Sequence, residues 1–140
     1  MITILIEKNK AIVRRWIEEV WQKANFSVID EIIAKDFFVN YRENPNREVY
    51  KKKVKSYYAG FPDFKCTIDD MVAEGDKVVI RWTGVGTHKG EFWGVAPTGK
   101  KVKMKGASII RIEAGKMIEE WGYMDVLDVM KQLGITTIGE

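Results

Sequence analysis

The chain has 140 residues, of which 46% are hydrophobic and 31% are charged, and this length and composition indicate one globular domain. The net charge is +3 and Cys66 is the single cysteine, so an internal disulfide is excluded and a cytoplasmic location is expected. No stretch reaches the ~18 apolar residues of a membrane span, and the apolar start from Met1 to Ile6 is too short for a signal peptide.

The segment before Gly60 predicts three helices and one strand. Apolar residues recur at helical spacing from about Thr3 to Lys23, which predicts a long amphipathic helix. Ser27 is a candidate N-cap for a short second helix, and Asp36–Tyr41 has the aromatic and β-branched residues of a strand. The turn 44–46 then starts a third helix that runs to about Ala59. This helix carries four lysines that point around it rather than along one side: Lys51, Lys52, Lys53 and Lys55. We therefore expect neither a nucleic-acid nor a membrane partner.

The rest of the chain changes to the period of β-strands. Four strands are predicted, over Phe64–Ala73, Lys77–His88, Lys101–Glu113 and Lys116–Tyr123. A last helix, Val126–Leu133, ends at Gly134, and residues 135–140 form a tail. Helices followed by antiparallel strands predict one α+β domain over residues 1–140. In such a domain the helices pack on one side of a bent sheet that leaves a concave pocket.

Several segments of the strand region, in their order and spacing, are similar to a known family. They are Glu74–Thr83, Gly86–Val95, Pro97–Lys100, Arg111–Trp121, Asp125 and Gln132–Gly134. Together they resemble the SnoaL-like polyketide cyclases of the nuclear transport factor 2-like superfamily, over about the whole chain. The resemblance implies a cone-shaped α+β barrel with a strongly curved, mostly antiparallel sheet and a short C-terminal helix, often paired as a homodimer through the sheet. It also implies an aldol ring closure with a pocket aspartate as acid/base, without metal or cofactor.

Asp125 is the position that matches the family's aspartate. Alternation along the last strand places Trp121, Tyr123 and Asp125 on one face, where a carboxylate beside a carbonyl substrate would take an α-proton. Asp125 also directly precedes the last helix, with Asp128 three positions on, which is the arrangement of a helix N-cap. The sequence leaves both roles open.

The other candidate residues would surround the ligand. His88 shares the alternation of Ile80 and Trp82, so it would support Asp125 or bind substrate, or else lie at the surface where its strand ends. The polyketide cyclases have a histidine near the position of Gly115-Lys116, and this chain has none there. Eight aromatic residues are expected in the core or on the ligand wall: Trp16, Tyr41, Tyr57, Phe61, Trp82, Trp93, Trp121 and Tyr123.

Three functions follow as alternatives. The sequence contains no cluster of metal ligands, no Gly-x-Ser-x-Gly elbow and no dinucleotide-binding loop, so we expect no metal and no cofactor. The first hypothesis is a polyketide-cyclase-like lyase or isomerase that performs acid/base chemistry on a small apolar carbonyl compound. The others are a non-catalytic binder of a small apolar ligand and a hydrolase related to epoxide-opening members of the superfamily.

Overall fold

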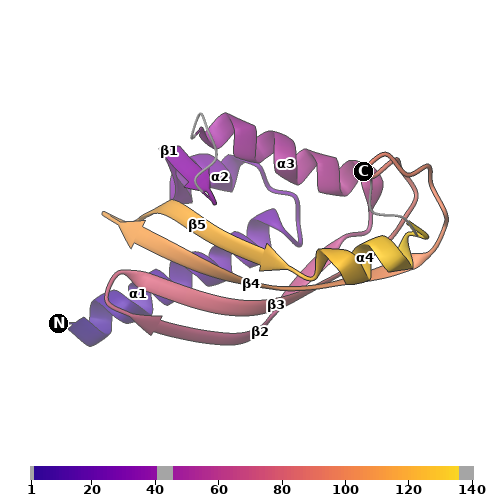
Figure 1. Cartoon of the computed structure of the whole chain (residues 1–140). Coiled ribbons are helices and arrows are strands. Elements are labelled where there is room, and N and C mark those ends of the chain that lie inside the picture. The colour runs from indigo at the N-terminus through magenta and orange to yellow at the C-terminus, as the bar shows by residue number, and fades with distance from the viewer. Residues whose placement is uncertain (1, 41–45, 136–140) are drawn as a thin grey trace.

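The computed structural model describes residues 2–40 and 46–135, and it has the α+β architecture that the sequence predicts (Figure 1). Helices α1 (Ile2–Arg15), α2 (Ser27–Ile32) and α3 (Arg47–Gly60) lie on one side of a curled five-stranded sheet. The short helix α4 (Val126–Gln132) follows the last strand. None of the helices in this part of the chain combines the length and the apolar character needed to cross a bilayer.

The sheet is mixed and mostly antiparallel. Its strands are β1 (Ile33–Val39), β2 (Lys65–Glu74), β3 (Lys77–Thr87), β4 (Lys101–Glu113) and β5 (Lys116–Met124), in the spatial order β1-β5-β4-β3-β2. Strand β1 runs parallel to β5, and the other neighbours are antiparallel. The four consecutive strands agree with the predicted ones to within one or two residues, whereas the first strand begins earlier than expected, at Ile33.

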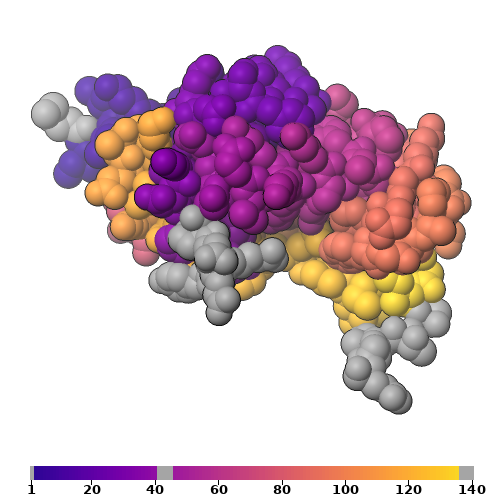
Figure 2. Space-filling model, turned by 90° about the horizontal axis from the view of Figure 1, so that it is seen from above, coloured from indigo at the N-terminus to yellow at the C-terminus, as the bar shows by residue number. Residues whose placement is uncertain are grey.

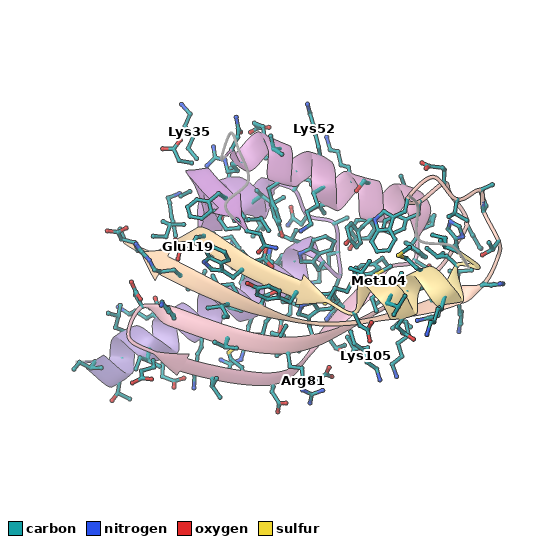
Figure 3. The ribbon with its side chains drawn as sticks, viewed as in Figure 1. Lys35, Lys52, Arg81, Met104, Lys105 and Glu119 are labelled. Atoms are coloured by element: carbon teal, nitrogen blue, oxygen red, sulfur yellow. The ribbon has the colours of Figure 1, made fainter. Side chains whose placement is uncertain are left out.

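Alternation divides the sheet into an inner and an outer face. On β4 the inner residues are Val102, Met104, Ser108, Ile110 and Ile112, all buried beneath the helices. Arg81 and Lys105 project from the other side of the sheet, away from the helices (Figure 3). The core therefore lies between the helices and the inner face of the sheet.

Two helix features differ from the sequence prediction. The first helix ends at Arg15 and continues as a π-helical segment, η1 (Trp16–Val20), rather than as one α-helix to Lys23. Ser27 is the first residue of α2 and not its cap, since its hydroxyl donates to Asn25 Oδ1 at 2.7 Å and the N-cap position is Phe26. Because Ser27 already lies inside the helix, its oxygen is not in the position before the first turn from which a side chain caps the free backbone N–H groups.

The connection between β3 and β4 lies against the C-terminal end of α3, as the view from above shows (Figure 2). The backbone N–H groups of Lys89 and Gly90 donate to Gly60 O at 3.0 and 3.1 Å. A Cβ at position 90 would lie 1.9 Å from Ala59 O, so glycine is required for this approach. This contact fixes the loop over one end of the core.

Candidate functional site

A cavity opens between the N-terminal helices and the inner face of the sheet, with a volume of about 50 Å³. This volume holds a few water molecules, or the end of a small ligand that inserts into the cavity. Most of its wall is apolar or aromatic, and the charged members are one lysine and one glutamate. The lining residues are Trp16, Ile17, Trp21, Lys53, Tyr57, Phe64, Cys66, Trp82, Ser108 and Glu120.

The π-helical segment shapes the helical side of the cavity. In an α-helix, residues five apart project about 140° from one another, whereas a π-turn takes in an extra residue and brings such positions closer together. Trp16 and Trp21 both donate their indole N–H to the hydroxyl of Tyr50 on α3, at 2.7 and 2.9 Å. Tyr50 is buried, so this pair of bonds fixes both indole rings in the cavity wall.

A chain of hydrogen bonds crosses the sheet side of the cavity. Trp82 Nε1 on β3 donates to Ser108 Oγ on β4 at 3.2 Å, and Ser108 Oγ donates to Glu120 Oε2 on β5 at 2.9 Å. The Trp82 ring lies across the sheet because position 106 is glycine, where a Cβ would meet Trp82 Cζ2 at 2.4 Å. Three neighbouring strands thus contribute one polar side chain each.

Glu120 is the chemical centre of this arrangement. It is 6% exposed, and while Oε2 is held by Ser108, the buried Oε1 has no hydrogen-bond partner in the described part of the chain. Such an atom costs free energy in a protein interior, and its presence calls for an explanation. An anchored carboxylate with one free oxygen on a cavity is able to accept a proton from, or donate one to, a bound molecule.

A β-bulge turns Glu120 inward. Ile112 pairs with Met117 and Arg111 pairs with Glu119, so Ile118 is an extra residue on β5. Met117 and Glu120 therefore both face the core, although simple alternation would place them on opposite faces. Glu119 faces the other way and lies 3.7 Å from Arg111 Nε.

The other ionisable groups near Glu120 stay protonated at neutral pH. Burial raises the pKa of the Cys66 thiol to about 12, with smaller contributions from the charges of Asp69 and Glu120. Burial also raises the pKa of Tyr50 well above its usual value, and the charge of Glu120 adds to this effect. Neither group is therefore an anionic nucleophile in this site.

The last strand directs Trp121, Tyr123 and Asp125 away from the cavity. Trp121 and Tyr123 share one face, which the bulge makes the outer face, and Asp125 follows the end of the strand. Tyr123 is 59% exposed, and Asp125 is exposed and caps α4, with Oδ1 accepting from Asp128 N at 3.1 Å. The capping geometry is thus present, and Asp125 does not line the cavity.

His88 lies in a second buried cluster outside the cavity wall. It is fully buried rather than at the surface, and its Nδ1 accepts from Thr98 N at 3.2 Å, so a neutral ring carries its proton on Nε2. Its ring lies 5.4 Å from that of Phe61, which is also buried.

Trp93 is 41% exposed on the β3–β4 connection and stacks on Phe92.

Of the eight aromatic candidates, Trp16, Tyr57 and Trp82 line the cavity, and Tyr41 lies outside the described residues. Sequence reasoning missed Glu120, Ser108 and Lys53. A signal for Ser108 was present, because it is the one hydroxyl in the otherwise apolar or glycine row of β4. Glu120 carried no such signal, since its inward direction depends on the bulge.

Comparison with known proteins agrees with this fold. Residues 11–133 match the family described as SnoaL-like polyketide cyclase. A candidate polyketide cyclase from Acidithiobacillus ferrooxidans is 31% identical with a TM-score of 0.80, covering 93% of this chain and 96% of its own. AclR, a candidate hydroxylase from Streptomyces galilaeus, is 26% identical with a TM-score of 0.83, covering 94% and 99%.

A third similar structure is IdmH, a candidate polyketide cyclase from Streptomyces antibioticus. It is 28% identical with a TM-score of 0.78, covering 90% of this chain and 98% of its own. No curated protein matches the sequence. The family match over most of the chain and the similar fold of a 31% identical structure agree, and the chain belongs to the SnoaL-like polyketide cyclase family.

Proposed function

We propose that this protein is an enzyme that performs cofactor-independent acid/base chemistry on a small apolar carbonyl compound, with Glu120 as the acid/base. The observation that carries the proposal is that Glu120 lines an aromatic cavity while its buried Oε1 has no hydrogen-bond partner in the described part of the chain. Family membership supports a cyclase-like or hydroxylase-like role. The carboxylate would take an α-proton from the bound carbonyl compound; in a ring closure it would return the proton to the alkoxide that the aldol addition forms, and in an isomerisation it would return it to another carbon of the enolate.

The site suits this reaction in two further respects. Ser108 holds Oε2, so the carboxylate keeps one orientation while Oε1 moves the proton. The indole and phenol rings in the wall present mostly apolar surface, which strengthens electrostatic interactions with a ligand that displaces water from the cavity. A ligand larger than the cavity requires the wall to open, and the side chains of α3 form part of that wall.

Asp125 is the competing assignment, because it occupies the position that the family resemblance indicates. Its exposure and its bond to Asp128 N favour a capping role over proton transfer in the cavity. The two assignments separate by substitution, since Asn caps a helix about as well as Asp but does not exchange a proton.

The test is hydrogen–deuterium exchange at the α-carbon of acetophenone in D₂O, followed by ¹H NMR. We expect wild-type protein to accelerate exchange over buffer and Glu120→Gln to reduce the acceleration by about 100-fold or more. Glu119→Gln is the matched control, because it removes a neighbouring carboxylate that faces away from the cavity. Asp125→Asn should leave the rate unchanged.

The outcomes separate the hypotheses. Wild-type exchange in Glu120→Gln would overturn the assignment of Glu120, and loss of exchange in Asp125→Asn alone would transfer the role to Asp125. Binding of acetophenone without any accelerated exchange would favour the non-catalytic binder and overturn the enzymatic proposal.

We also propose that the outer face of the sheet pairs with a second copy of the chain. Cross-strand neighbours form one apolar row there, because Val72 pairs with Val79, Val79 with Ile109 and Ile109 with Trp121. Val72 is 63% exposed and Ile109 is 36% exposed. Such contiguous apolar surface is typical of an interaction site. Light scattering should give a dimer mass for wild type and a monomer mass for Ile109→Glu, and a monomeric wild type would contradict the proposal.

A further inference from the structure

Lys53 is the one positively charged side chain in the cavity wall. It lies on α3, half-buried, and forms no ion pair with any carboxylate in the described part of the chain. The nearby lysines on α3 interact with other residues. The ammonium of Lys51 binds Asp30 at 2.8 Å and Glu48 at 3.0 Å, and that of Lys55 lies over the ring of Phe26.

The cavity therefore presents two charges of opposite sign that do not neutralise each other. Lys53 comes from the helical side and Glu120 from the sheet side, and their charged atoms are not within ion-pair distance. Five of the other eight lining residues are aromatic. A negatively charged oxygen on a bound ligand would give the ammonium of Lys53 the counter-charge that the described residues do not supply.

We infer that the pocket selects apolar ring compounds that carry an anionic oxygen, which Lys53 binds while Glu120 faces the reacting carbon. This inference rests on the proposed function, because it names the substrate class of the same site. The lysine ammonium is a compact charge on a flexible side chain, so it can bind a carboxylate or an enolate oxygen. Unlike the planar guanidinium of arginine, it does not require two oxygens in a fixed arrangement. The remaining surface of the ligand would contact the aromatic wall.

The probes are benzoate and benzamide, which have nearly the same shape and differ in charge. Binding is followed by ¹H–¹⁵N NMR of the indole N–H signals, because Trp16, Trp21 and Trp82 line the cavity and their N–H groups are hydrogen-bonded in its wall. We expect benzoate to bind about fivefold to tenfold more tightly than benzamide, the range of a charged contact in a partly solvated site. Lys53→Met should abolish the preference, and Lys53→Gln should do the same if the methionine variant is unstable.

Lys52→Met is the matched control, because it makes the same change in net charge on the same helix. Lys52 is exposed and projects away from the body of the protein (Figure 3). It should retain the full preference for benzoate. Equal affinity for the two probes, no perturbation of the cavity indoles by either, an unchanged preference in both Lys53 variants, or equal loss in Lys52→Met would each overturn the inference.

Failure of this inference is distinguishable from failure of the proposed function. The probes bind without turnover, so the preference is measured independently of proton exchange. Glu120→Gln should bind benzoate at least as tightly as wild type, because it removes a negative charge from the same cavity while leaving Lys53 in place. Weaker benzoate binding in this variant would contradict the inferred division of roles.

Discussion

The hydrogen bond between Ser108 and Glu120 should be measurable as a coupling free energy of at least about 1.5 kcal/mol, the lower end for a hydrogen bond to a charged group. Ser108 is 1% exposed and Glu120 is 6% exposed, so the bond lies in the protein interior, where an unpaired polar group is costly. Ser108→Ala removes the 2.9 Å bond to Oε2 and the acceptor for Trp82 Nε1. Adding about 1 kcal/mol for the second, neutral bond gives an expected destabilisation of about 2.5–4 kcal/mol.

The assay is a double-mutant cycle with Ser108→Ala, Glu120→Leu and the double variant, each unfolded in urea and followed by tryptophan fluorescence. Glu120→Leu should cost less than Ser108→Ala, because it also removes a buried charge that has one unpartnered oxygen. In the double variant the loss from Ser108→Ala should shrink to the contribution of the Trp82 bond. A coupling below about 0.5 kcal/mol would refute the view that Ser108 holds the carboxylate in place.

Three further predictions concern stability. Gly106→Ala should destabilise by about 1–3 kcal/mol or more, measured by thermal unfolding, because its Cβ would lie 2.4 Å from Trp82 Cζ2; an unchanged midpoint would contradict this packing. The pKa of the Cys66 thiol is about 12 in the folded protein against the ordinary value of 9.0, so the unfolded chain loses the thiol proton at lower pH. The contribution of Cys66 to the free energy of unfolding is therefore full below pH 9 and falls as the pH rises toward 12. Urea titrations at pH 8 and 10.5 should show wild type losing up to about 1.4 kcal/mol per pH unit more than Cys66→Ala, and equal losses would contradict this. Asp125→Ala should cost about 0.5–2 kcal/mol and Asp125→Asn almost nothing, whereas equal effects in urea unfolding would argue against the cap.

The fold was predictable because each element carries a regular period. The alternation in β3 and β4 runs without interruption, so both strands agree closely with the predicted bounds. The helical period before Gly60 similarly located α1 and α3. Local pattern and tertiary packing agree at these elements, which is why a reading of one sequence sufficed there.

The cavity was less predictable because it depends on two irregularities. The π-helical segment η1 directs Trp16 and Trp21 to one hydroxyl, and nothing in helical periodicity signals the extra residue. The bulge at Ile118 reverses the faces of β5, so the aromatic row that contains Trp121 lies outside and Glu120 lies inside. A one-residue shift changes the direction of every later side chain on the strand.

An unpartnered buried atom does not by itself identify a site, and the comparison of His88 with Glu120 shows why. His88 Nε2 and Glu120 Oε1 are both buried without a hydrogen-bond partner among the residues described. His88 packs against Phe61 and does not line the cavity, whereas Glu120 does, beside a lysine that has no ion-pair partner in the described chain. A buried carboxylate oxygen without a partner and a lysine without an ion pair line the same aromatic cavity, and one ligand would engage both, which is the physical reason for assigning function to that cavity.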